Sequence, residues 1–463
     1  MLHNMPEENR EITKVRIWQQ NVRKSLVATL ALLNGLKDEY DLVCIQEPHF
    51  DFRGITRATG VWTVVYPSNH MTEQEEGTTR SLMLIHCRIS TNAWTQIEVA
   101  SKDVTAIQLE GPGGKLNIYN IYNDCTHSRT IETLKAHFER RGRRMRARNN
   151  GGERHMEGDI WLGDFNRHHP MWDDDTNVGL FTRANLDAAE GLIELVANQG
   201  MEMVLPKGIP TIKNAQGNYT RPDNVFCSAD IEDWVTQCTT SPGQTPPKAD
   251  HFPIHTTVDF TMSKSKRPQS FNYRAVEWDT FLAELIKNLE AIPEPRRIDD
   301  EEQFRKALQD VSQAIRNTIE KIVPRRRPSP HSKRWWTKDL DIARSQAKRA
   351  GEKAYKYRHH PAHPSHEEAR RRRNDYSELI KKTKRDFWME WLEGVNAKSV
   401  WDANRFISAP GSDRGRTKIP ALKEKVNGRI VREVQDNAEK SRMLHAIFFK
   451  DPPAHEDDEG AFQ

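Results

Sequence analysis

In the first 260 residues, short apolar runs end in polar residues whose side chains can carry chemistry. Asp159–Leu162 is such a run, and Gly163-Asp164-Phe165-Asn166 follows it directly. Apolar runs of this length that end in glycine and asparagine are typical of buried strands. We therefore expect Asp164 and Asn166 to lie at the mouth of a buried strand.

Other polar residues have the same setting. Asn21 follows Val15–Trp18, Glu47 follows Leu42–Ile45, Tyr122 follows Leu116–Tyr119, and two later motifs are Arg221-Pro222-Asp223 and Asp250-His251. Tyr119 is an alternative to Tyr122. Because the two tyrosines are three residues apart, a strand would turn them to opposite faces, and Tyr122 is nearer the strand end.

These residue types suit a hard cation such as Mg²⁺ bound to phosphate oxygens, since they are carboxylates, carboxamides, a tyrosine and an Asp–His pair. Mg²⁺ takes only one or two protein carboxylates, and we predict Glu47 as the first. Phosphodiester cleavage is the reaction that this set favours. It needs a group that orients and deprotonates water, for which Asp164 and His251 are candidates. It also needs donors around the phosphate, for which the candidates are Asn21, Asn166 and Tyr122.

The order of these motifs resembles the endonuclease/exonuclease/phosphatase superfamily over roughly the first 260 residues. The resemblance implies a four-layer α/β sandwich, with two packed mixed sheets flanked by helices, and a phosphodiesterase that uses Mg²⁺ or Mn²⁺. It implies that Glu47 is the metal ligand, with Asn21 beside it and Asp250 as a second acid on the metal side. The catalytic set that it implies is Asp164 and Asn166 for water and phosphate, Tyr122 for phosphate, and His251 oriented by Asp223.

The stretch Asn166-Arg167-His168-His169-Pro170-Met171-Trp172 narrows this resemblance. It is similar to the N-x-H-H-P-x-W stretch of the apurinic-endonuclease-like domains of non-LTR (LINE-type) retrotransposons, which implies nicking of DNA to leave a 3′-hydroxyl. Two positions depart from the family pattern. Lys248-Ala249 precede Asp250 where a serine is usual, and Arg221-Pro222-Asp223 replaces Ser-x-Ile-Asp.

Each motif also has a plainer interpretation, because Asp and Asn often only cap turns through local backbone hydrogen bonds. Adjacent histidines diverge, so we expect His168 and His169 to pack in a loop with Trp172 instead of binding metal. Two alternative functions stay open. One is a small-molecule phosphatase of the same fold, and the other is an inactive remnant that binds nucleic acid.

The second half of the chain differs in charge from the first. Residues 1–260 contain 27 Lys and Arg against 34 Asp and Glu, a net charge of −7, whereas residues 261–463 contain 43 against 32, a net charge of +11. We predict an endonuclease domain over 1–262, a linker and helical hairpin over 263–330, and a basic helical connector over 331–463. The connector resembles the region before a reverse transcriptase, and we find no Tyr/Phe-x-Asp-Asp polymerase motif.

Residues 324–388 are the most basic part, with 20 Lys and Arg against 8 Asp and Glu and with interleaved Trp and Tyr. Basic charge with aromatic rings favours nucleic-acid binding, so we expect DNA as substrate and RNA as a candidate second partner. The alternative is a solvated helical face. The five cysteines lack C-x-x-C spacing and no 18-residue apolar run occurs, so we expect an intracellular protein without a membrane span, nuclear if it is of the retrotransposon type.

Overall fold

The computed structural model describes residues 11–56, 58–70, 77–148, 156–214, 216–264, 271–293, 300–324, 335–395, 422–426, 429–434 and 437–448. Its contacts divide the chain into two compact units. One unit combines Met1–Ser265 with Thr337–Gln463, and the other is Lys266–Trp336. No helix in the described ranges is both long and apolar enough to cross a membrane.

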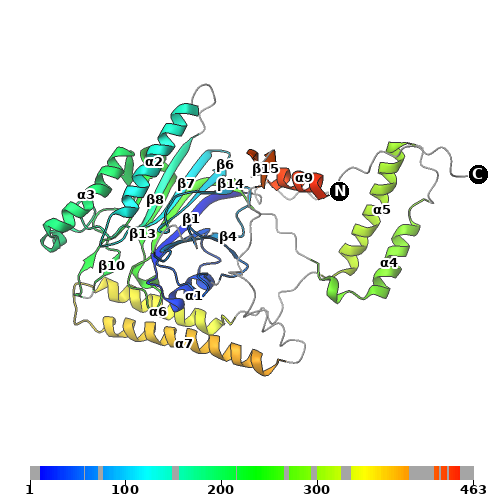
Figure 1. Ribbon diagram of the computed structural model, residues 1–463. Coiled ribbons are helices and arrows are strands. Elements are labelled where there is room, and N and C mark those ends of the chain that lie inside the picture. Colours follow the sequence, from blue (N-terminus) through cyan, green and yellow to red (C-terminus); the bar gives the residue numbers. More distant parts are fainter. Residues whose placement is uncertain are drawn as a thin grey trace, which may run out of the picture. The chain divides into compact units, whose positions relative to one another are not determined.

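The first unit contains two six-stranded mixed sheets (Figure 1). The strands of one sheet lie in the order β13 (Val235–Thr240), β14 (Ile254–Ser263), β1 (Glu11–Asn21), β2 (Leu42–Gln46), β4 (Ser81–His86) and β3 (Trp62–Val65). Those of the other lie in the order β5 (Trp94–Ile97), β6 (Val104–Gly111), β7 (Gly114–Tyr122), β8 (Glu157–Asp164), β12 (Asp223–Ser228) and β9 (Met201–Met203). Only the β1–β2 and β7–β8 pairs are parallel among these neighbours.

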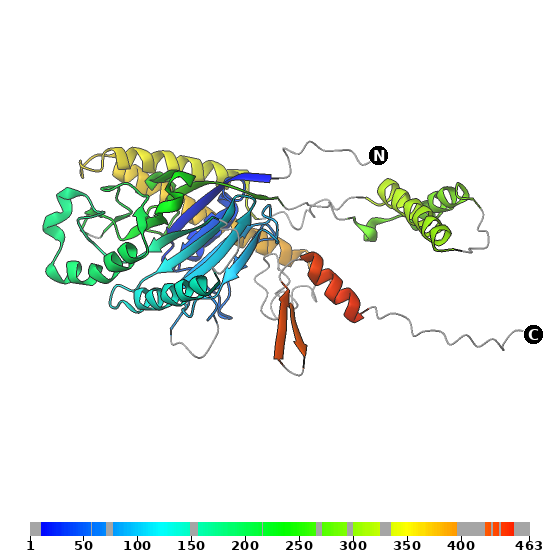
Figure 2. The ribbon, with the colours of Figure 1, turned by 90° about the horizontal axis from the view of Figure 1, so that it is seen from above.

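Apolar side chains hold the layers together. The inner faces of the sheets share one core that includes Ile17, Ile118 and Leu162. The outer face of the second sheet packs against α2 (Arg129–Arg148) and α3 (Arg183–Asn198), and the outer face of the first packs against α1 (Leu26–Gly35). The arrangement is a four-layer α/β sandwich, as the resemblance implied, and Figure 2 shows the sheets from above.

Short elements complete this part of the chain: the 3-10 helices η2 (Asp175–Leu180), η3 (Ala229–Trp234) and η4 (Pro242–Gln244), and a small hairpin of β10 (Ile212–Lys213) and β11 (Tyr219–Thr220). Ser25 caps α1, and Thr182 and Asn185 form a capping box at α3, because each side chain satisfies an amide left free by the first helical turn.

The C-terminal part of the first unit is mainly helical. Helices α6 (Lys338–Lys356) and α7 (Ser365–Glu393) pack together, α6 against η4 and α7 against α1. They are followed by a hairpin of β15 (Leu422–Val426) and β16 (Arg429–Val434) and by α9 (Asn437–Phe448).

The second unit is built around a helical hairpin, after the short η5 (Tyr273–Ala275). Helices α4 (Trp278–Glu290) and α5 (Glu301–Ile322) are joined by a hydrogen bond from Asn288 to Thr318 and an ion pair between Lys321 and Glu284. This part of the chain, within the predicted range 263–330, therefore contains a helical hairpin.

Candidate active site

The polar residues at the strand ends gather along one edge of the two sheets. Parallel pairing aligns Tyr122 of β7 with Asp164 of β8, and antiparallel pairing aligns Asp164 with Asp223 at the start of β12. In the other sheet, Asn21 ends β1 beside the end of β2, and Glu47 follows β2 directly. The sandwich brings these strand ends face to face, which places residues distant in sequence in one site.

Gly163 allows the sharp turn and the close backbone approach at the end of β8. Its φ of 153° lies in a region that only glycine adopts without strain. A Cβ there would come within 1.8 Å of the Ile121 carbonyl oxygen on β7. Asn166 also has a positive φ of 50°, which asparagine tolerates better than most residues. The Gly163–Asn166 motif thus turns the chain sharply at the end of β8 and leaves Asp164 inside the site.

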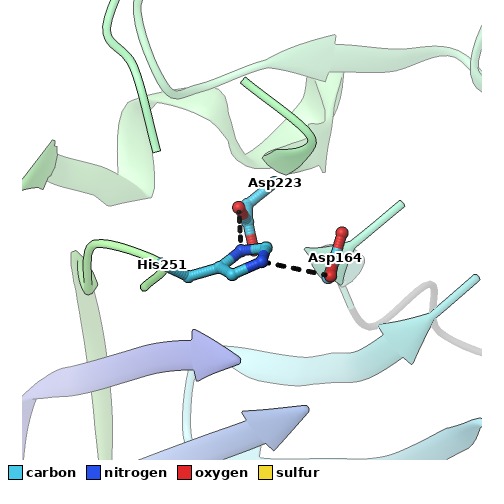
Figure 3. A group of neighbouring side chains, drawn as sticks. All are labelled: Asp164, Asp223 and His251. Atoms are coloured by element: carbon cyan, nitrogen blue, oxygen red, sulfur yellow. Dashed lines mark hydrogen bonds and ion pairs between the residues drawn. The ribbon is translucent and has the colours of Figure 1, made fainter. Parts of the chain in front are cut away.

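A buried cluster of Asp164, Asp223 and His251 occupies the centre of the site (Figure 3). The His251 Nδ1 is 2.8 Å from Asp223 Oδ2, and its Nε2 is 3.9 Å from Asp164 Oδ2. Asp164 and Asp223 are each only 1% exposed. Two carboxylates therefore face one imidazole away from bulk water.

The loop that carries His251 is held by hydrogen bonds to its backbone. Gln20 Nε2 donates to the His251 carbonyl oxygen at 2.8 Å, and the Phe252 amide donates to the Thr211 carbonyl oxygen at 2.6 Å. Thr211 also donates its hydroxyl to Asp223 Oδ2 at 2.6 Å, the same oxygen that His251 approaches. Thr211 is thus a support for the Asp223–His251 pair.

Asn21 links the two halves of the site. Its side-chain amide donates to Asp164 Oδ2 at 2.9 Å and to Glu47 Oε1 at 3.3 Å, while its oxygen accepts from the Arg23 amide. Glu47 has a positive φ of 46°, and its backbone is held by hydrogen bonds to Lys24 and Arg80. The Glu47 backbone is therefore held by hydrogen bonds, and its carboxylate is linked to Asp164 through the side-chain amide of Asn21.

Two further predicted residues are Asn166, which lies in the site, and Asp250, which lies at its margin. Asn166 donates its backbone amide to Asp164 Oδ1 at 3.0 Å and its side chain to the Asn123 carbonyl oxygen at 2.8 Å. Asp250 instead forms an exposed ion pair with Arg23 at 3.3 Å. Asp250 lies outside the buried cluster, although it directly precedes His251.

The two tyrosines have separate surroundings. Tyr119 belongs to the core beneath α2 and packs edge-on against Phe138. Tyr122 lies near Glu47 and Asp164, which together with burial raise the pKa of its hydroxyl. The geometry therefore supports Tyr122, and not Tyr119, as a residue of the site.

Comparison with known proteins finds a family model that is similar to part of this region. Residues 116–255 match the family model described as endonuclease-reverse transcriptase. The similarity to this family is limited to these residues. The match runs from the start of the β7 apolar run to the strand after His251, so it contains Tyr122, Asp164, Asp223 and His251.

Several solved structures are similar to about half of this chain. The endonuclease domain of TRAS1, a telomere-specific non-LTR retrotransposon, is 17% identical, with a TM-score of 0.39, and the match covers 53% of this chain and 99% of that chain. The AP endonuclease LMAP from Leishmania major is 14% identical, with a TM-score of 0.39, and the match covers 53% of this chain and 88% of that chain. An AP endonuclease from Archaeoglobus fulgidus is 17% identical, with a TM-score of 0.38, and the match covers 53% of this chain and 99% of that chain. No curated protein matches the chain.

Two further arginines support the site, and the sequence predicted a site role for neither of them. Arg80 lies over the Tyr122 ring, 4.6 Å from its centroid, and pairs with Asp103 at 2.7 Å and with Asp124. The sequence signal that could have pointed to Arg80 is its place just before the apolar run Leu82–Ile85.

Arg221 is the second, and it is fully buried. Its guanidinium donates to the carbonyl oxygens of Trp172, Leu205 and Pro206 and to the side chain of Asn224. It joins the loop after Asn166 to the strand that begins at Asp223. This departure from the family pattern therefore has a structural role. His169 contacts Trp172 in the same loop, as expected from the sequence.

Burial and charge shift the titration of the central cluster. Burial raises the pKa of the Asp164 carboxyl, the Asp223 charge acts in the same direction, and His251 opposes both. Burial disfavours a charged imidazole, but the Asp223 and Asp164 carboxylates outweigh it, so the pKa of His251 is raised. The site thus favours a charged His251 and an Asp164 that accepts a proton more readily than an exposed aspartate.

The donors of the site fit a hard divalent cation. Asp164 and Asp223 each offer a carboxylate oxygen, and these oxygens lie within 4.8 Å of each other and of a ring nitrogen of His251, which is favoured in its charged form and is not counted as a ligand. Glu47 and Asn21 add a carboxylate and an amide next to Asp164. Oxygen ligands of this kind suit Mg²⁺ or Mn²⁺ better than softer ions.

Proposed function

We propose that this chain is a metal-dependent DNA endonuclease of the retrotransposon type, which nicks one strand and leaves a 3′-hydroxyl. The observation that carries the proposal is the buried Asp164–Asp223–His251 cluster, in which one imidazole lies between two carboxylates at the mouth of the sheets. An arrangement of this kind can orient a water molecule and stabilise charge on a phosphate, the two requirements of phosphodiester hydrolysis.

Asp164 and His251 have separate roles in this proposal. Asp164 orients the attacking water and accepts its proton, for which a raised pKa is suited. His251, held by Asp223, carries positive charge toward the phosphate oxygens and can donate a proton to the leaving oxygen. Asp223 keeps the imidazole in orientation through Nδ1, so that Nε2 faces the reacting groups.

Three neutral side chains complete the phosphate site in this proposal. Asn21, Asn166 and Tyr122 surround Asp164. Asn166 and Tyr122 offer donors to the phosphate oxygens, and Asn21 holds Asp164 and Glu47 with its two amide hydrogens. Their positions are set before substrate binds, because each is held by a strand end or a backbone hydrogen bond. Preorganised donors of this kind favour the more highly charged transition state over the substrate.

Glu47 is the residue that we assign to Mg²⁺ or Mn²⁺, with Asn21 beside it and Asp250 on the same side. The bound cation would neutralise charge on the phosphate and lower the barrier to attack. Asn21 holds Glu47 and Asp164 in a fixed relation through a single amide. Asp250 is turned to Arg23 in this structure, so its contribution would require that ion pair to open.

The proposed substrate is DNA, and a DNA target implies a nuclear protein in a eukaryotic cell. The basic stretch 324–388 makes RNA a candidate second partner, bound by positive charge and aromatic rings. Within this stretch several arginines of α7 pair with acids on the same helix, for example Arg371 and Arg372 with Glu368. Such pairs reduce the charge available to nucleic acid and support the alternative of a solvated face.

Two other functions are compatible with the fold. A small-molecule phosphatase would use the same cluster, and an inactive remnant would bind nucleic acid without cleaving it. The intact hydrogen bonds among Asp164, Asn21, Asp223 and His251 argue against a decayed site. The motif from Asn166 to Trp172 favours a nuclease over a phosphatase.

A plasmid assay separates the three functions. The purified chain is incubated with supercoiled DNA and Mg²⁺, with and without EDTA, and the nicked product is offered to a DNA polymerase. Metal-dependent nicked circles that the polymerase extends are expected for the proposed function. Phosphate release from sugar phosphates without nicking would favour the phosphatase, and DNA binding with neither reaction would favour the remnant.

A further inference from the structure

The loop that carries His251 is in contact with helix α6, far along the chain. This loop joins β13 to β14, and the hydrogen bond from the Ser241 amide to the Pro253 carbonyl oxygen closes it at its base. The turn η4 lies at its beginning and His251 near its end. Helix α6 touches both parts, at two different positions along the helix.

The first contact is between two glycines. A Cβ on Gly351 would come within 2.9 Å of the Gly243 Cα, and a Cβ on Gly243 would come within 2.6 Å of the Lys348 carbonyl oxygen. The backbone of α6 thus lies directly on the backbone of η4. Glycine within a helix is unfavourable compared with alanine, so its presence at position 351 is explained by this close approach.

The second contact is between aromatic rings. Tyr355 lies one turn after Gly351, and its ring is 5.9 Å from that of Phe252 and 6.1 Å from that of Tyr219, centroid to centroid. Tyr219 and Phe252 are also 6.1 Å apart, so the three rings form one cluster. Phe252 directly follows His251, and a movement of this ring would therefore move the backbone of the histidine.

The loop between the two contacts is strained. Lys248 has a φ of 69°, in the left-handed region that non-glycine residues adopt at a cost. Such a conformation persists only where the surroundings fix it from both sides. Gly243 and Phe252 are the two points, before and after Lys248, at which α6 contacts this loop.

Helix α6 also has an anchor away from the loop. Arg344 donates to the Gly35 carbonyl oxygen at the end of α1 and forms an ion pair with Glu39 at 3.1 Å. The helix is therefore attached to the sandwich independently of the His251 loop. A rigid helix with two attachments can hold the loop in place, whereas a helix attached only to the loop would move with it.

We propose that α6 is a positioning element of the nuclease site, in which Gly351 and Tyr355 hold the loop that presents His251 to Asp223 and Asp164. The inference rests on the proposed function for its effect on catalysis. It also changes the role of this segment, because residues predicted as a connector after the endonuclease domain become a support that positions the active site. Tyr355 is a positioning residue and does not touch the reacting groups.

The test uses the full chain with four variants. Tyr355→Ala removes the ring from the cluster, and Tyr355→Phe keeps it. Tyr357→Ala is the matched control, since Tyr357 lies at the same end of α6 but stacks on His363, away from the loop. Gly351→Ala favours the helix intrinsically but forces α6 and η4 apart.

Two measurements are made on each variant: the kcat and KM for nicking, and hydrogen exchange of the backbone amides of residues 248–253 by mass spectrometry. We expect Tyr355→Ala and Gly351→Ala to lower kcat at least tenfold with KM changed less than threefold, and to speed exchange in the loop. Tyr355→Phe and Tyr357→Ala should stay within threefold of the unchanged chain. Loss of kcat in Gly351→Ala without a lower melting temperature would separate positioning from general destabilisation.

Wild-type kcat and loop exchange in both Tyr355→Ala and Gly351→Ala would overturn the inference. Equal effects of Tyr355→Ala and Tyr357→Ala would also overturn it, because they would indicate a general loss of structure. If the unchanged chain does not nick DNA, the proposed function fails. The exchange measurement then still decides whether α6 holds the loop.

Discussion

Replacing Thr211 by valine tests whether the support behind Asp223 matters for catalysis. Thr211 is completely buried, and its hydroxyl donates to Asp223 Oδ2 at 2.6 Å. Valine has nearly the same shape but no hydroxyl, so the carboxylate oxygen that holds His251 Nδ1 loses one of its two side-chain donors. The backbone carbonyl of residue 211, which accepts from Phe252, is unchanged.

The size of the effect follows from the charge on the acceptor. A hydrogen bond to a charged group contributes roughly 1.5–3 kcal/mol, and each 1.4 kcal/mol lost from transition-state stabilisation is about a tenfold change in rate. We therefore expect Thr211→Val to lower kcat by about 10- to 100-fold, if most of that energy orients the histidine. The KM for DNA should change little, because Thr211 is buried behind Asp223.

The assay is steady-state nicking of a labelled duplex, with thermal unfolding measured in parallel. Thr211→Ser is the matched control, since it keeps the hydroxyl and should retain at least a third of the wild-type kcat. A Thr211→Val variant with more than half of the wild-type kcat would refute the reasoning, because the Asp223–His251 pair would then need no support from this hydroxyl.

Three further predictions concern the metal, the stability of the site and the pH dependence of folding stability. Glu47→Ala should abolish nicking at millimolar Mg²⁺ with an unchanged melting temperature, because a ligand at a strand end is lost and the core is intact; full activity would contradict the metal assignment. Arg221→Met should lower the free energy of unfolding in denaturant titrations by about 3–5 kcal/mol, since buried carbonyl oxygens lose their donor; a loss under 1 kcal/mol would contradict this. Burial lowers the pKa of His255, a residue of β14 whose ring packs against Trp18 and Tyr40, from 6.5 to about 4, so folding stability falls from pH 6.5 to 4 as the unfolded chain binds the proton, and His255→Gln should remove roughly 3 kcal/mol of that fall; an unchanged pH profile of unfolding would contradict it.

The grouping of the site residues could be predicted because strand ends in a sandwich meet at one edge. An apolar run precedes each of Asn21, Asp164 and Tyr122. If these runs are strands, each of the three residues lies near the end of its strand, as the structure has them. The superfamily resemblance then supplied the number of layers, which no run of residues gives by itself. It also implied the pairing of His251 with Asp223, which the structure contains. The hydrogen bonds of Asn166 and Thr211 did not follow from either source.

The roles of Thr211 and Arg221 could not be predicted from the order of residues alone. Both lie in or beside a loop rich in Gly and Pro, where no hydrophobic period indicates which side chain is turned inward. Their functions depend on contacts with Asp223 and with the carbonyl oxygens of Trp172 and Leu205, which the fold brings near. A buried arginine in particular is read as exposed when only its charge is considered.

The position of α6 depends on long-range contacts of the same kind. Its sequence predicts a basic helix, and the charge of residues 324–388 directs attention to nucleic acid. The glycine at position 351 carries the relevant information, but only when Gly243 is known to lie opposite. An amphipathic helix shows that one face is covered and does not show by what.

The most direct test of the account is the single-turnover nicking rate of His251→Ala on a duplex at saturating DNA and Mg²⁺. We predict a rate at least about 100-fold below wild type, with DNA affinity and melting temperature nearly unchanged, because an acid–base group is lost from a folded site. Asp164→Asn should show a loss of the same order. A tenfold or smaller loss in both variants would contradict the account and move the chemistry away from the Asp164–Asp223–His251 cluster.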